Sequence, residues 1–137
     1  QDEARLREIG DRVFVWGHRE DIPQILAGSD LVVDASYAGL GLTGSIREAL
    51  AVETPVVATD LEGMPELVVE GETGLLVPPR NPEALAQAIL RMLENPARAK
   101  AMARSGRKRV EAGFSLAVKI ERTEALYRRL LAERASP

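Results

Sequence analysis

The residues with the clearest potential for binding chemistry form the segment GLTGSIRE, which begins at Gly41 and ends at Glu48. Gly41 and Gly44 let a ligand approach the backbone without meeting a Cβ atom. Thr43 and Ser45 add hydroxyl donors. Since the first N–H groups of a helix are unpaired and carry a partial positive charge, a loop that leads into a helix in this way suits a phosphate or another anion.

The same residues also have a purely structural interpretation. Ser45 and Glu48 have the spacing of a capping box, in which the glutamate accepts a hydrogen bond from the Ser45 N–H. The segment matches neither the Walker loop nor the dinucleotide motif GxGxxG. Spacing alone leaves ligand contact and helix capping equally open.

The elements around this loop predict an α/β fold. Short apolar runs closed by turn residues predict strands at 12–17, 31–36, 55–59 and 75–79. Between them, apolar spacing and capping residues predict helices at 2–9, 21–30 and 45–52 and a helical turn at 65–68. The strands are continuously apolar, which is typical of a parallel sheet covered on both faces. We also expect Trp16 to lie in the core.

A parallel, doubly wound sheet of this kind fixes where a ligand binds. Right-handed connections place the C-terminal ends of all strands at one edge, and ligands bind in the crevice beyond that edge. The glycine loop follows the strand that ends at Ser36. The pattern therefore places Glu48 and the loop at the binding edge.

The chain becomes helical after Pro82. Three helices are predicted, at 82–95, 96–112 and 116–134. The last one has Ile120, Tyr127, Leu130 and Leu131 on one side. We interpret residues 1–137 as one partial domain, with an α/β core at 1–80 and a helical segment at 81–137.

Composition excludes several classes of protein. The 137 residues suffice for one domain, and a formal charge of -3 with 4% aromatic residues argues against a nucleic-acid groove. The absence of cysteine excludes disulfides and thiolate metal sites. No apolar stretch approaches the ~20 residues that span a bilayer, and the charged N-terminus does not resemble a signal peptide. We expect a cytoplasmic protein.

Residues 12–95, from RVFVWG through DLVVDAS, GLGLTGSIREALAVETPVVATDLEGMPE and GETGLLVPP, resemble the C-terminal, nucleotide-sugar-binding domain of GT-B glycosyltransferases. The similarity is closest to the retaining, glycogen-synthase-like enzymes of family 4. The resemblance implies that Glu48 binds the ribose hydroxyls of the donor and that backbone N–H groups around Leu42–Ser45, in the loop that begins at Gly41, hold its diphosphate. Both roles agree with elementary chemistry, because a carboxylate accepts from a diol and a helix start holds an anion.

The resemblance also indicates residues near the donor sugar. The segment EGMPE matches a Gly-Gly-x-x-Glu loop of the family, with Glu62 in place of the first glycine, so Gly63 and Glu66 are candidates for the sugar side. Arg19 follows the lone histidine, His18, at a position that the family often keeps basic. Its alternative role is a surface ion pair with Glu20 or Asp21.

The sequence departs from the family at the motif Glu-x7-Glu. The first glutamate contacts the donor sugar, and the matching position here is Leu40, or Ala38 if the glycine loop carries a two-residue insertion. Either that carboxylate is lost or another residue, such as Asp34 or Tyr37, takes its place.

The family donor domain has a further strand and helix before the region seen here, and an N-terminal acceptor domain. We therefore expect a fragment of a larger transferase that binds a UDP-, GDP- or ADP-linked sugar without an obligatory metal or other cofactor and is inactive alone. Two other functions remain open: a non-catalytic nucleotide-binding module, and a receiver-type signalling domain with Asp34 as phosphoacceptor. Because the missing elements leave an unpaired strand edge and an uncovered stripe on helix 116–134, we also expect a homodimer or a domain-swapped pair.

Overall fold

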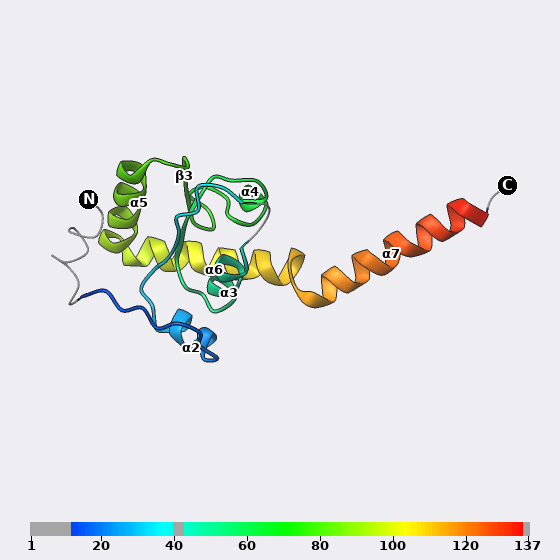
Figure 1. Ribbon diagram of the computed structural model, residues 1–137, viewed down its shortest axis with the longest axis horizontal. Helices are drawn as coiled ribbons and strands as arrows, with labels where there is room; N and C mark the ends of the chain where they lie inside the picture. Colours follow the sequence, from blue (N-terminus) through cyan, green and yellow to red (C-terminus); the bar gives the residue numbers. More distant parts are fainter. Residues whose placement is uncertain (1–11, 40–42, 136–137) are drawn as a thin grey trace.

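The computed structural model describes residues 12–39 and 43–135. Among the described residues, three short strands and five helices form a compact body, from which a last helix extends (Figure 1). The elements are α2 (Ile22–Ala27), β1 (Val32–Asp34), α3 (Gly44–Ala51), β2 (Val56–Thr59), α4 (Met64–Leu67), β3 (Leu75–Val77), α5 (Pro82–Glu94), α6 (Pro96–Gly113) and α7 (Leu116–Ala135). The predicted helix at 2–9 lies outside the described residues.

The strands form a parallel sheet in the order β1-β2-β3, as the sequence predicts. In the register, Asp34 lies opposite Ala58 and Thr59 lies opposite Val77. The carboxyl ends of all three strands therefore meet at one edge. β3 ends at Val77 because Pro78 and Pro79 have no N–H to donate to a ladder.

Helices cover both faces of this sheet, which confirms the α/β, doubly wound interpretation. The side chains of Val56 and Ala58 pack with α2, α3 and α4 on one face, whereas Val57 packs with α5 on the other. Helix α6 contributes to both faces: Met102 packs in the α5 cluster and Val110 in the α3 cluster. α6 thus joins the two layers.

The predicted strand at 12–17 is wrong. This segment is irregular and forms no ladder with any described strand, and its side chains are exposed, with Val15 92% exposed. Trp16 is 58% exposed, so its assignment to the core is also wrong; its ring lies under the Arg19 guanidinium, 5.6 Å from the ring centroid. A strand needs a partner and a covered face, and the described sheet offers this segment neither.

The predicted C-terminal helices all form, and the last one leaves the body. α7 extends away from the sheet beyond the end of α6 (Figure 1), and all its side chains from Lys119 to Arg134 are exposed. Its own surface supplies ion pairs one turn apart, between Arg128 and Glu124 and between Arg129 and Glu133. The apolar stripe of the helix is thus uncovered, with Ile120 51%, Tyr127 63% and Leu131 67% exposed.

The described part of the chain contains no helix that is both long enough and apolar enough to cross a membrane.

The exposed stripe generates the first prediction. We expect the purified chain to sediment as a dimer at micromolar concentration, because association removes large apolar patches from water. Replacing Leu130 and Leu131 together by Glu should make the chain monomeric. Arg129→Gln, which changes the charged residue just before them, should leave the dimer intact. A wild-type chain that stays monomeric at these concentrations would contradict the prediction.

Candidate functional site

The loop after β1 is tied to the end of β2 at the carboxyl edge of the sheet. The Ser36 N–H donates to Asp34 Oδ1 at 2.9 Å, and the Thr59 hydroxyl donates to the Ser36 carbonyl oxygen at 2.7 Å. Both Asp34 and Thr59 are buried. These contacts fix the direction in which the chain leaves β1 for the glycine loop.

Asp34 is ionised at neutral pH. Burial raises the pKa of this carboxyl, but the hydrogen bonds from Ser36, together with the nearby Thr43 hydroxyl, outweigh burial and hold the pKa below its ordinary value. Among the described residues, nothing meets hydrogen-bond geometry with the buried Thr43 Oγ1. Asp34 therefore stabilises the loop as a carboxylate, with the Thr43 hydroxyl close by at the start of α3.

The capping-box interpretation of the glycine loop is wrong. α3 begins at Gly44, its N-cap is Thr43, and the cap makes no side-chain hydrogen bond. Ser45 therefore lies inside the first turn, where its N–H is not the one that a capping box pairs. The first N–H groups of α3 lie at the carboxyl edge of the sheet, and within the described residues no side chain caps them.

Glu48 keeps a free carboxylate one turn into α3. Its side chain is exposed, and within the described residues it has no hydrogen bond or ion pair. A Cβ placed on Gly44 would lie 3.5 Å from Glu48 Oε1, so the carboxylate folds back toward the start of the helix. The structure therefore brings Thr43, Gly44, Ser45 and Glu48 together, whereas the predicted contacts Gly41 and Leu42, and Leu40 before them, lie outside the described residues.

The candidates for the sugar side separate into two places. Gly63 is the left-handed N-cap of α4, with φ 83°, and Glu66 is exposed in the first turn of that helix, which follows β2 at the carboxyl edge. Arg19 instead makes the surface ion pair that was its alternative role, with its Nε and Nη2 donating to the two Asp21 carboxylate oxygens at 2.7 and 2.5 Å. The described structure therefore gives Arg19 a partner outside the sheet edge.

Of the residues considered for the missing first glutamate, Ala38, Asp34 and Tyr37 are described and Leu40 is not. Ala38 is exposed, and Tyr37 is 67% exposed with Arg80 5.8 Å from its ring centroid. Asp34 is only 8% exposed and is engaged by Ser36. Tyr37 is thus the more accessible of the two substitutes.

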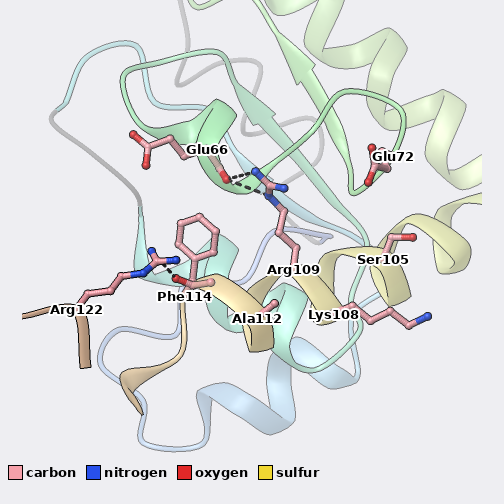
Figure 2. Close-up of a pocket in the computed structure, with 9 residues that line it drawn as sticks. Glu66, Glu72, Ser105, Lys108, Arg109, Ala112, Phe114 and Arg122 are labelled. Atoms are coloured by element: carbon pink, nitrogen blue, oxygen red, sulfur yellow. Dashed lines mark hydrogen bonds between the residues drawn. The ribbon is translucent and has the colours of Figure 1, made fainter. Parts of the chain in front are cut away.

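Two cavities flank the junction of α6 and α7, and each contains one candidate residue. A cavity of about 550 Å³ between α3 and the start of α7 is lined by Arg47, Glu48, Val110 and Leu116, among others. One of about 680 Å³ is lined by Glu66, Arg109 and Arg122 (Figure 2). Phe114 lines both. The sequence analysis did not identify Arg109 as a contact residue. In the sequence it is distinguished only by its position in the amphipathic pattern of α6.

The described residues contain no group of three or more histidine, aspartate or glutamate side chains that could hold a metal ion.

Comparison with known proteins identifies the family. Residues 1–95 match the family model described as glycosyl transferases group 1. The chain belongs to this family. Its fold is that of the GT-B glycosyltransferases, and the resemblance to their nucleotide-sugar-binding domain is confirmed. Membership of a transferase family argues against the receiver interpretation, as does the burial of Asp34.

Relatives of known name are similar along most of this chain. The lipopolysaccharide core mannosyltransferase LpcC of Rhizobium leguminosarum is 36% identical over 129 residues, which cover 93% of this chain and 36% of that protein. The α-maltose-1-phosphate synthase of Mycolicibacterium smegmatis is 37% identical over 133 residues, covering 88% and 34%. The chain thus spans about a third of the length of these relatives.

Solved structures show the same arrangement. Sucrose-phosphate synthase from Thermosynechococcus elongatus superposes with a TM-score of 0.88 and 36% identity, covering 96% of this chain and 34% of that one. HepE from Anabaena, in complex with UDP-glucose, gives a TM-score of 0.83 at 29% identity, covering 92% and 35%. The C-terminal domain of a group 1 transferase from Francisella tularensis has the same fold, with a TM-score of 0.71, 24% identity and coverage of 83% and 60%.

The state of Asp34 generates the second prediction. A carboxyl whose folded-state pKa is lowered stabilises the fold above its unfolded pKa of about 3.9, and this contribution is lost as the pH falls through the folded value. Asp34→Asn should therefore lower the free energy of unfolding by about 1 kcal/mol at pH 7, and the difference from wild type should shrink below about pH 4.

Chemical denaturation at several pH values measures this difference. Asp30→Asn, at an exposed carboxylate just before β1, is the control and should have little effect at any pH. A deficit of Asp34→Asn that stays constant from pH 7 to pH 3 would show that the carboxylate charge is not the stabilising feature.

Proposed function

We propose that this chain is the donor-binding part of a retaining glycosyltransferase and holds a nucleotide sugar at the start of α3. One observation carries the proposal: at the carboxyl edge of the sheet, α3 begins after Thr43 without a side-chain cap, and Glu48, which has no partner within the described residues, turns back toward that end of the helix. A nucleoside diphosphate presents a diphosphate anion and a ribose diol at adjacent positions, which this pair of groups matches.

The assignment of roles follows from that match. The N–H groups of Gly44 and Ser45 bind the diphosphate, together with the loop from Gly41 to Thr43, and Glu48 accepts hydrogen bonds from the ribose hydroxyls. Gly63 and Glu66, at the start of α4, lie toward the sugar. The complexes of HepE with UDP and with UDP-glucose support this proposal, because that protein has a similar fold and binds this class of ligand.

The chemistry that this half supplies is stabilisation of the leaving group. Sugar transfer breaks the bond between the anomeric carbon and a diphosphate oxygen, so that negative charge accumulates on the diphosphate. Backbone N–H groups that already point at that charge stabilise it without reorganisation. The nucleotide sugar is the substrate in this proposal, and no resident cofactor or obligatory metal is invoked.

Transfer itself belongs to the whole protein. The acceptor domain of the family is proposed to face this edge of the sheet, with the reaction in the cleft between the two domains, where both reactants are held together away from water. A non-catalytic nucleotide-binding module is the second candidate, favoured by the exposed Ala38 at one of the two positions matching the first motif glutamate.

Glu48 provides the third prediction. In a thermal-shift and calorimetric titration with UDP, GDP, ADP and their glucose or mannose conjugates, at least one nucleotide should raise the melting temperature. Glu48→Gln should weaken binding of that nucleotide by about 1–3 kcal/mol, the scale of a charged hydrogen bond. Its stability should change by less than about 1 kcal/mol, because the side chain has no described partner to lose.

Glu111→Gln is the matched control. Glu111 is an exposed glutamate that lines the same cavity as Glu48 but pairs with Arg107 on α6. It should leave nucleotide affinity unchanged. Equal nucleotide affinity of wild type and Glu48→Gln, with a clear loss of stability in the variant, would assign Glu48 a structural role and contradict the proposal.

A further inference from the structure

Helix α6 contacts both elements that hold the proposed donor residues. Leu50, near the C-terminal end of α3, lies against the bare Cα of Gly106: a Cβ there would be 2.4 Å from Leu50 Cδ2. Arg109, three residues later, reaches α4. The spacing between the ribose side of the site on α3 and the sugar side on α4 is therefore set through α6.

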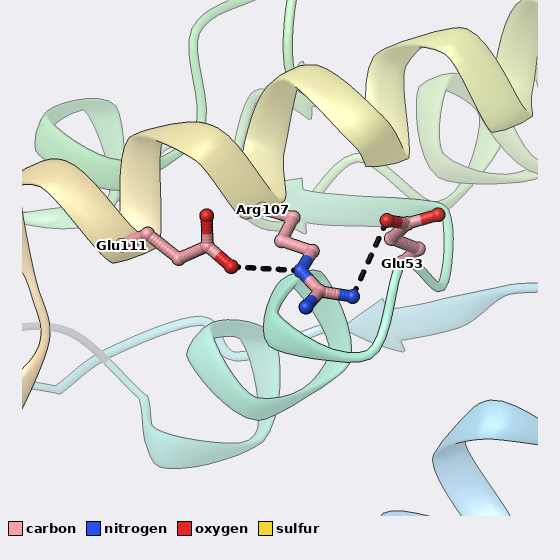
Figure 3. Close-up of polar contacts among 3 residues, drawn as sticks. All are labelled: Glu53, Arg107 and Glu111. Atoms are coloured by element: carbon pink, nitrogen blue, oxygen red, sulfur yellow. Dashed lines mark hydrogen bonds and ion pairs between the residues drawn. The ribbon is translucent and has the colours of Figure 1, made fainter.

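Ion pairs lie between α6 and the C-terminal end of α3. Arg107 Nη1 donates to Glu53 Oε1 at 3.3 Å, and its Nε donates to Glu111 Oε1 at 2.8 Å (Figure 3). Glu53 lies just after α3, with φ 60°, at the end opposite to Gly44. All three side chains of this cluster are exposed, so the ion pairs fix little by themselves. The packing at Gly106 determines the position of α3.

The contact of α6 with α4 depends on one side chain. Arg109 donates from Nε and from Nη2 to the carbonyl oxygen of Glu66, at 3.0 and 2.7 Å (Figure 2). α4 has only four residues, so its last carbonyls have no partner within the helix. Two charged N–H donors on one such carbonyl form a strong and directional contact.

Because α4 is short, its contact with Arg109 also restrains the loop that precedes the helix. Met64 and Leu67 are buried and hold one side of α4 against the core, while Arg109 holds the other side at Glu66. The carboxylate of Glu66 points away from the Arg109 guanidinium (Figure 2) and has no partner in the part of the chain that the structure describes. Gly63 begins α4 in the left-handed conformation, so a tilt of this short helix moves Gly63 with it.

We propose that Arg109 is a positioning residue for the sugar side of the donor site, which it sets by fixing Gly63 and Glu66 relative to Glu48. This inference rests on the proposed function, since it assumes that α3 binds the nucleotide and α4 faces the sugar. Arg109 lies outside the sheet edge, and its loss affects recognition of the sugar but not recognition of the nucleotide.

The test compares two ligands in each variant of the 137-residue chain. The dissociation constants of UDP and of UDP-glucose are measured by calorimetry. The constant for UDP divided by the constant for UDP-glucose reports how much the sugar contributes to binding. Arg109→Gln should reduce this ratio by about three- to tenfold, the scale of one typical net hydrogen bond, with the affinity for UDP within twofold of wild type. Arg109→Lys keeps the charge but not the paired donors, and its ratio should lie between those of wild type and Arg109→Gln.

Lys108→Gln is the matched control. It removes a neighbouring positive charge from the same cavity, and within the described residues Lys108 has no hydrogen bond or ion pair to lose. It should leave both dissociation constants unchanged. Melting temperatures of all variants are recorded beside the binding data, so that a folding defect in Arg109→Gln is recognised and Arg109→Lys then decides the question.

The outcomes separate this inference from the proposed function. Equal weakening of UDP and UDP-glucose, or a lower melting temperature with an unchanged ratio, would make Arg109 a stabilising residue only and overturn the inference. A wild-type chain that binds both ligands equally would also overturn it, because no sugar contact would remain to be positioned. Absence of all nucleotide binding would instead contradict the proposed function itself.

Discussion

The close packing of α3 between the sheet and α6 is the constraint on which the site depends. Ile46, Ala49 and Leu50 are fully buried on one side of α3, and Leu50 occupies the space that a side chain at position 106 would fill. Glycine in the middle of a helix costs roughly 1 kcal/mol relative to alanine. Its presence at position 106 therefore indicates that the close approach of the two helices offsets this cost.

This packing explains why the opposite side of α3 is available for binding. With its apolar side fixed against the core, α3 must direct Glu48 outward and its own N-terminus toward the carboxyl edge of the sheet. The Thr59–Ser36 hydrogen bond and the Asp34 carboxylate fix the preceding loop at the same edge. The buried side of this eight-residue helix stabilises the fold, and the opposite side carries the residues proposed to bind the nucleotide.

Much of this arrangement could be predicted from the sequence, because local patterns determine it. Continuous apolar runs in the sequence mark the strands β1, β2 and β3. Apolar residues at helical spacing mark the helices α5, α6 and α7. The helix after the glycine loop was predicted at 45–52 and is observed at Gly44–Ala51, within one residue at each end. The family resemblance of residues 12–95 was correct for the same reason: an ordered series of local motifs is specific.

The predictions that failed depend on contacts between distant residues. The run at 12–17 has the composition of a strand, but a strand also requires a neighbour, and none of the described strands pairs with it. The capping box at Ser45 and Glu48 has the right spacing, but the helix begins at Gly44 with Thr43 as its N-cap, two residues before the N-cap that the box requires. The bond from Arg109 to Glu66 spans 43 residues and has no local signature.

The central claim is that a nucleotide binds at the start of α3, and mapping amide chemical shifts of the chain during titration with UDP tests it most directly. The account predicts that the largest shifts occur at Gly44, Ser45 and Glu48, with smaller shifts at Thr59, and that they saturate together. Shifts concentrated instead around Gly28, Ser29 and Thr54, which line a cavity of about 410 Å³ containing no residue of the proposed site, would contradict it. So would a titration in which neither UDP nor GDP or ADP moves the amides of α3.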